Sequence, residues 1–191
     1  MRIIALGPLA LFVFLLPLQA AEMVDSIEDI DSWVERVSGR VYDWELILVE
    51  RIMTYTHGTI PGIGQPSNEI IGWFQQENTE DFFDEYPLFI GNTYTYAGIT
   101  ACEEYYYLPG GELVYCSSMW DNGHGEECTY SDVFYFLDGE PVLFIEKNEE
   151  PVITMDMELL NMAERRKVQS ERLLWMFDEL FVPEPCIFQE K

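Results

Sequence analysis

The chain has 191 residues, with 35 acidic and 10 basic side chains that give a formal net charge of -25 at pH 7. This excess of carboxylates repels nucleic acid and anionic lipid and attracts cationic proteins, polyamines and divalent cations, so nucleic acid is excluded as a partner. A hydrophobic content of 48%, with 15% aromatic residues, is enough for a packed core and argues against intrinsic disorder.

Residues 1–21 have the pattern of a secretory signal peptide. Arg2 supplies one positive charge ahead of an apolar run over residues 3–18, and two alanines then precede the acidic part of the chain. The run is short and broken by prolines, which favours a cleaved signal over a membrane anchor. We therefore expect an exported protein, periplasmic or extracellular, whose single domain spans residues 22–191.

Apolar residues recur every three or four positions from Ile27 to Tyr55, a spacing typical of an amphipathic helix. Asp25 is a plausible cap for its start, and glycines and prolines mark its end. The pattern predicts a helix over 27–56 and a loop over 57–68.

Residues 69–146 contain short β-branched and aromatic runs separated by turn residues, which predicts an antiparallel meander. Pro109-Gly110-Gly111 and Asp138-Gly139 mark two hairpin turns. Asp121-Asn122-Gly123 predicts a third hairpin with a three-residue loop.

A second helix is predicted over 155–182, capped by Thr154 and followed by a tail at 183–191. The expected fold is therefore α+β: an antiparallel β-meander packed by a long N-terminal helix and a C-terminal helix. Four cations lie close together on the last helix and predict a solvated helix face. They are Arg165, Arg166, Lys167 and Arg172.

Four cysteines in an exported chain predict two disulfides rather than thiol or zinc chemistry. Counting outward from the expected turns places Cys116 opposite Cys128, and Cys102 then pairs with Cys186. A one-residue register slip would undo this assignment.

The same count places several tyrosines on the sheet face opposite the cysteines, with Tyr105 directly opposite Tyr115. Such a face predicts either a platform that binds sugars or a cationic peptide, or a core surface buried by a helix. The candidate ligand-binding residues are Tyr105, Tyr107, Tyr115 and Tyr135.

No nucleophile with an adjacent base and no metal-ligand or cofactor motif is evident, so no catalytic residue, metal or cofactor is expected. The sequence favours a monomeric, acidic, non-catalytic binding protein for a cationic protein or a small ligand. A hydrolase that uses two carboxylates in a cleft and an envelope-associated structural protein are the alternatives. Two facing carboxylates with a raised pKa in a deep pocket would favour the hydrolase.

Overall fold

The computed structural model describes residues 24–42, 47–51, 67–74, 87–96, 99–121 and 130–181. Within them the chain forms two helices and seven strands. In chain order these are α1 (Ile27–Tyr42), β1 (Ile47–Arg51), β2 (Ser67–Phe74), β3 (Phe89–Tyr96), β4 (Ile99–Tyr107), β5 (Leu113–Asp121), β6 (Tyr130–Leu137), β7 (Glu140–Glu146) and α2 (Met157–Phe181).

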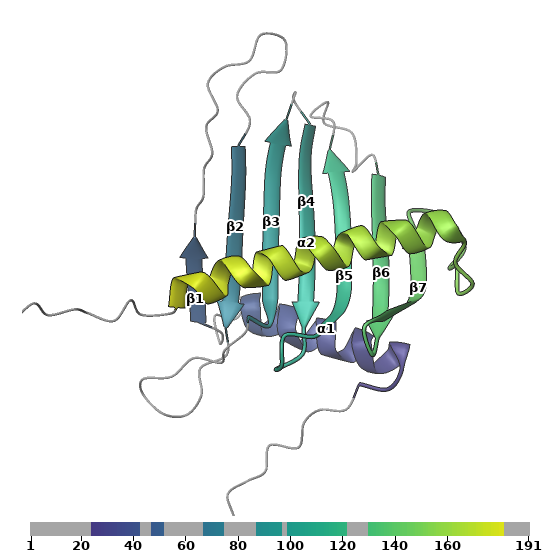
Figure 1. Ribbon diagram of the computed structural model, residues 1–191, viewed down its shortest axis with the longest axis horizontal. Coiled ribbons are helices and arrows are strands. Elements are labelled where there is room, and N and C mark those ends of the chain that lie inside the picture. The colour runs from purple at the N-terminus through teal and green to yellow at the C-terminus, as the bar shows by residue number, and fades with distance from the viewer. Residues whose placement is uncertain are drawn as a thin grey trace, which may run out of the picture.

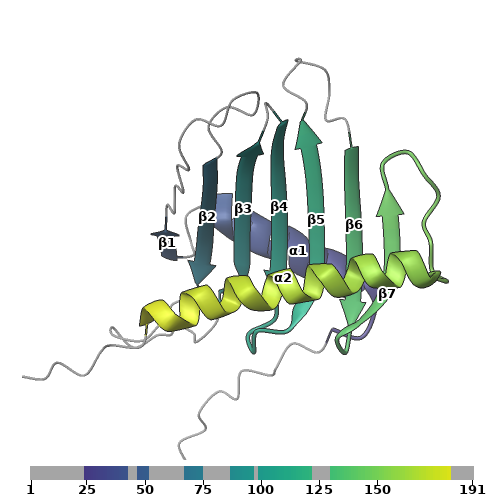
Figure 2. The same ribbon diagram turned by 45° about the horizontal axis from the view of Figure 1, so that its top comes forward.

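The strands form one sheet in the order β1 to β7, with every neighbouring pair antiparallel. Six of them, β2 to β7, make the meander that the sequence predicts, and the short β1 is added at its edge (Figure 1). The two helices lie on opposite faces of this sheet (Figures 1 and 2). The α+β class and the helix, meander, helix order are therefore confirmed.

Helix α1 is shorter than predicted. It begins after Ser26, whose Oγ accepts from the Asp29 backbone N–H at 3.2 Å and donates to the Asp29 carboxylate at 2.7 Å, so Ser26 and not Asp25 is the cap. The helix ends at Tyr42, and β1 begins at Ile47, so the predicted continuation to residue 56 is wrong. The run Ile47-Leu48-Val49 suits a strand as well as a helix, and its pairing with β2 decides between them.

Two of the three predicted hairpins are confirmed. Strands β4 and β5 are joined across Pro109-Gly110-Gly111, and β6 and β7 across Asp138-Gly139. Asp138 and Gly139 have φ values of 50° and 74°, as a two-residue type I′ hairpin turn requires.

The third hairpin has a different register from the predicted one. Trp120 pairs with Tyr130, which a three-residue loop at 121–123 does not allow. Pairing of β4 with β5 is also offset, because Tyr106 lies opposite Tyr115 while Tyr107 lies opposite Leu113. This bulge makes the predicted pairing of Tyr105 with Tyr115 wrong, and a one-residue slip moves each side chain to the other face.

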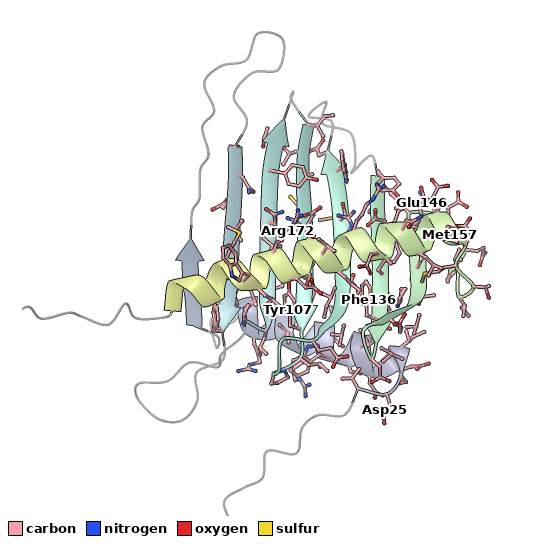
Figure 3. All side chains as sticks on the ribbon, viewed as in Figure 1. Asp25, Tyr107, Phe136, Glu146, Met157 and Arg172 are labelled. Carbon is pink, nitrogen blue, oxygen red and sulfur yellow. The ribbon has the colours of Figure 1, made fainter. Side chains whose placement is uncertain are left out.

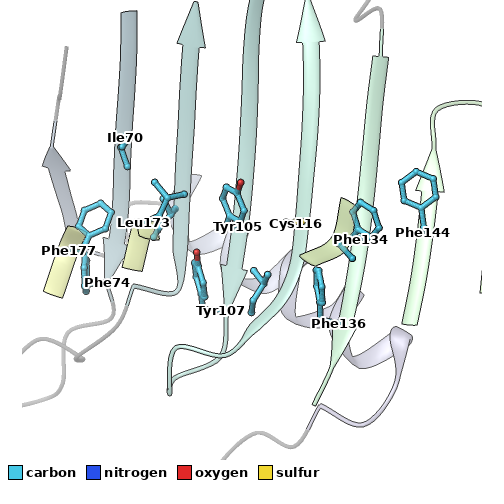
Figure 4. Close-up of a cluster of buried hydrophobic side chains, with 13 residues drawn as sticks. Ile70, Phe74, Tyr105, Tyr107, Cys116, Phe134, Phe136, Phe144, Leu173 and Phe177 are labelled. Atoms are coloured by element: carbon cyan, nitrogen blue, oxygen red, sulfur yellow. The ribbon is translucent and has the colours of Figure 1, made fainter. Parts of the chain in front are cut away.

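Each face of the sheet carries its own hydrophobic core. The core beneath α2 joins alternate strand residues to Ala163, Leu173 and Phe177 of the helix (Figure 4). The core beneath α1 joins the other face to Ile30, Trp33 and Val37. Because both faces are buried in this region, the central strands are apolar at consecutive positions there.

Helix α2 begins after Asp156, whose Oδ1 accepts from the backbone N–H groups of Glu158 and Leu159, each at 2.9 Å. The helix is therefore confirmed, but its cap is Asp156 and not Thr154. It crosses the strands from β7 toward β1, and β3, β4 and β5 continue beyond it toward the top of the view (Figure 1). In the described part of the chain, no helix has the length and apolar content needed to span a membrane.

Candidate functional site

A row of buried polar side chains crosses four strands on the α2 side of the sheet. The register places its members side by side, one from each of β3 to β6. This polar row consists of Asn92, Glu103, Ser118 and Asp132, exposed by 4%, 6%, 0% and 2%. Buried polar groups require partners, so the row needs a counter-charge from outside the sheet.

Arg166 of α2 supplies that counter-charge. Its guanidinium donates from one nitrogen to Glu103 Oε1 at 2.5 Å and from another to both oxygens of Asp132 at 3.2 Å. The second oxygen of Glu103 accepts from Asn92 Nδ2 at 2.9 Å and from the Tyr105 hydroxyl at 3.0 Å. One cation therefore holds two buried carboxylates that belong to different strands.

Burial and charge act in opposite directions on the pKa values of this network. Burial raises the pKa of Asp132, and the neighbouring Arg166 opposes that rise. Burial alone would lower the pKa of Arg166, but the carboxylates of Asp132 and Glu103 raise it above its ordinary value. The guanidinium thus remains charged and favours the ionised form of Asp132.

One buried acceptor of the polar row lacks a partner among the described residues. The Asn92 amide is oriented by Glu103, because a carboxylate only accepts and must face Nδ2. Asn92 Oδ1 is then left without a hydrogen bond, as is Oδ1 of Asn68 on the neighbouring strand. The part of the sheet face next to β2 therefore has acceptors that the described chain leaves unused.

Aromatic side chains form the next row, on the part of the strands that continues past α2. The register aligns Tyr94, Ala101, Trp120 and Tyr130, and we call the three aromatic residues the aromatic row. Trp120 is 38% exposed, yet its Nε1 donates to Ser118 Oγ at 2.9 Å. Its ring lies edge to face with Tyr94 at 6.4 Å between centroids. The indole is thus both accessible and held in one orientation.

A pocket of about 500 Å³ begins at Tyr130 and extends along the β7 end of the molecule. Glu146 and Met157 mark this end in Figure 3. Its apolar lining is Phe144, Val152, Leu159 and Met162, and its acidic lining is Glu146, Glu149, Glu150, Asp156 and Glu158. We call it the acidic pocket.

The four tyrosines predicted as a platform do not share a face. Tyr105 and Tyr107 are buried under α2, whereas Tyr115 and Tyr135 belong to the α1 side. On that side Tyr106, Tyr115 and Tyr135 form a chain of edge-to-face ring contacts, with centroids 5.4 and 5.2 Å apart. The prediction that one face carries all four is wrong, because the β4–β5 bulge shifts the register.

The hydroxyl groups of these tyrosines are used inside the protein. Tyr107 donates to the Ser170 carbonyl at 3.5 Å, and Tyr135 donates to Asp31 at 2.8 Å. Burial raises the pKa of Tyr115 to about 12 and raises the pKa of Tyr105 further. These side chains are therefore placed as core residues, as the alternative interpretation of the sequence expected.

Cys102 and Cys116 lie on opposite faces and are free thiols, and no disulfide joins the cysteines that the structure describes. Cys116 pairs with Phe134 across β5 and β6, so the count that placed it opposite Cys128 is wrong. Burial raises its pKa to about 12, which makes it an inert thiol. Cys128 and Cys186 lie outside the described residues.

The cation cluster of α2 also differs from its prediction as a solvated face. Arg166 is in the buried network, and Lys167 Nζ donates to the Gly139 carbonyl at 2.7 Å. Arg165 and Arg172 are exposed, as expected.

Sequence reasoning missed the polar row, although a signal for it exists. Glu103 stands two positions before Tyr105, and Asp132 stands two positions before Phe134, so both acids are in phase with residues that face the core. An acid in phase with core positions requires a buried cation, and Arg166 is the only described cation that both acids contact through a hydrogen bond.

Comparison with known proteins finds no family model, no curated protein and no solved structure that matches this chain.

Proposed function

We propose that this protein is an exported, non-catalytic binding protein that takes a cationic ligand on the α2 side of its sheet. The observation that carries the proposal is Trp120, an accessible indole fixed between Ser118 and Tyr94. The face of an indole attracts cations more strongly than any other side-chain ring. A fixed ring also loses little conformational entropy when a ligand stacks on it.

The charge around the aromatic row favours the same class of ligand. The chain carries a net charge of -25, and the acidic pocket opens beside Tyr130 at one end of the row. A negative potential over this surface raises the local concentration of cations and speeds their encounter with the site.

The state of the buried acids supports binding over hydrolysis. Glu103 and Asp132 lie on the same face of the sheet with Ser118 between them, and Arg166 bonds to both carboxylates. A general acid must hold a proton near neutral pH, and the guanidinium next to Asp132 opposes the rise in the pKa of that group that burial causes. Neither carboxylate lines the acidic pocket.

The signal-like residues 1–21 support export, and the acidic composition supports a cationic partner in that compartment. An envelope-associated structural protein is the alternative, and the presence or absence of specific ligand binding distinguishes the two.

Isothermal titration with choline, and with maltose as an uncharged ring ligand, tests the proposal. We expect choline to bind the wild-type protein and to lose about tenfold in affinity in Trp120→Ala, since a partly desolvated cation–π contact is worth about 1–2 kcal/mol. Trp175→Ala is the matched control, because Trp175 is 61% exposed on α2.

An equal loss of choline affinity in both tryptophan variants would contradict the proposal. Binding of maltose that depends on Trp120, with no binding of choline, would assign the aromatic row to neutral ring ligands instead.

A further inference from the structure

We propose that the acidic pocket binds an aliphatic polyamine, with the methylene chain on its apolar floor and the ammonium groups at its carboxylates. This inference rests on the proposed function, because the pocket continues from the aromatic row at Tyr130. It adds the chemical class of the cation and the residues that would select it.

The pocket has two chemically distinct parts. Phe144 is buried, and Val152, Leu159 and Met162 are half-buried, which gives a surface suited to a hydrocarbon chain. Glu149, Glu150 and Glu158 are exposed around this floor. A volume of about 500 Å³ is within the usual range for a small-molecule site.

Backbone hydrogen bonds close the segment that carries Glu149 and Glu150. Residue 152 returns to β7 through a bridge, in which the Phe144 N–H donates to the Val152 carbonyl at 3.0 Å and the Val152 N–H donates back at 2.8 Å. Between them the Glu149 N–H donates to the Glu146 carbonyl at 3.0 Å, and Asn148 adopts a φ of 65°. The acidic segment is thus a closed turn whose shape exists before any ligand arrives.

The charged side chains that line the pocket are all acidic. Five acidic residues line the pocket, and the lining includes neither lysine nor arginine. The lining therefore produces a negative potential that attracts a cation.

The arrangement favours an extended cation over a metal ion or an anion. In the described part of the chain, no group of three or more acidic, histidine or cysteine side chains is placed to hold a metal ion. The carboxylates are therefore spread out, which suits several ammonium groups along a chain. The helix N-terminus offers little to an anion, because Asp156 already accepts from the N–H groups of Glu158 and Leu159.

Isothermal titration with spermidine at fixed ionic strength tests this inference. We expect the double variant Glu149→Gln/Glu150→Gln to lose about tenfold in affinity, since two exposed ion pairs contribute up to about 1 kcal/mol each. The matched control is Glu28→Gln/Glu35→Gln, which removes the same charge from exposed positions on α1, across the sheet. Melting temperatures of both variants establish that they fold.

A second comparison separates the pocket floor from charge alone. Cobalt(III) hexaammine carries the same charge as spermidine but has no methylene chain, so we expect it to bind at least about tenfold more weakly, because burial of each methylene contributes about 0.8 kcal/mol. Equal affinity for the two cations, or an equal loss of spermidine affinity in the two double variants, would overturn the inference. Either result would mean that the cations bind only through general attraction to the negative charge of the protein.

The two proposals fail separately. If spermidine affinity depends on Glu149 and Glu150 while choline affinity does not depend on Trp120, the proposed role of the aromatic row is wrong and the polyamine site in the acidic pocket is supported. If choline affinity depends on Trp120 while spermidine affinity does not depend on the two glutamates, the polyamine site is wrong and the role of the aromatic row is supported.

Discussion

Replacing Arg166 with methionine removes the cation that holds the two buried acids while keeping a long apolar stem. Three hydrogen bonds from the guanidinium disappear, one to Glu103 and two to Asp132. The side chains of Glu103 and Asp132 are only 7% and 2% exposed, so water cannot replace the guanidinium without rearrangement.

The expected cost is about 3–5 kcal/mol in the free energy of unfolding at neutral pH, the range for removing one partner of a buried ion pair. Two features keep the cost from being larger. Glu103 keeps its hydrogen bonds from Asn92 and Tyr105, and the Arg166 side chain is itself 17% exposed. Burial already raises the pKa of Asp132, so loss of Arg166 makes that group bind a proton more readily. The destabilisation should therefore shrink as the pH falls.

Urea unfolding followed by tryptophan fluorescence measures this difference. The control Arg165→Met removes the neighbouring exposed charge and should change stability by less than about 0.5 kcal/mol. The triple variant Arg166→Met/Glu103→Gln/Asp132→Asn removes all three charges and should recover most of the loss, because the buried charges are no longer unpaired.

A cost below about 1 kcal/mol for Arg166→Met, or equal costs for the two arginine variants, would refute the buried network. Failure of the triple variant to recover stability would show that packing of the Arg166 stem matters more than its charge.

Two further predictions concern other positions. Glu104 lies on the α1 side, where burial raises its pKa above 4.5 despite hydroxyl donors from Tyr106 and Ser117 at 3.5 Å. A raised pKa means that the folded state holds the proton more tightly, so the stability this group contributes below pH 4.5 is lost as the pH rises through its folded pKa. Glu104→Gln should therefore raise the melting temperature at neutral pH and leave it nearly unchanged at acid pH; a rise of the same size at both would contradict this sign. Gly72→Ala places a Cβ 2.7 Å from the Phe177 ring and should lower the free energy of unfolding by about 1–3 kcal/mol. In the same unfolding assay Gly39→Ala, which meets no atom within 4 Å in helix α1, should raise the free energy of unfolding by about 0.5–1 kcal/mol. Equal effects of the two glycine variants would show that α2 does not pack closely on β2.

Local signals predicted the elements that depend on short-range chemistry. The Asp138-Gly139 turn was found because only a few residue types adopt two successive positive φ values. The helix over Met157–Phe181 was found because a polar cap and the prolines after it define its limits, although the cap was placed two residues early. The local signal is ambiguous at Ile47–Arg51, and the prediction of a helix there is wrong. Pairing with the neighbouring strand β2 determines that this segment is a strand.

The candidate site was not predicted, because it depends on register and on which helix covers which face. The bulge between Tyr106 and Tyr107 moves Tyr115 to the α1 side, and nothing in the sequence of either strand marks that extra residue. Trp120 and Tyr130 are neighbours in the register of β5 with β6, which differs from the register that the turn residues at 121–123 indicate.

The sequence by itself determined the α+β class, the antiparallel meander between two helices, and the acidic charge that favours a cationic ligand. These properties follow from composition and from periodicity along the chain, which need no knowledge of distant contacts. Only the tertiary structure decided that Arg166 is buried between Glu103 and Asp132, that the predicted tyrosines are core residues, and that Trp120 stays accessible. The reason is that each of these depends on strand register and on how far α2 extends over the sheet, and both are set by contacts between residues far apart in the chain.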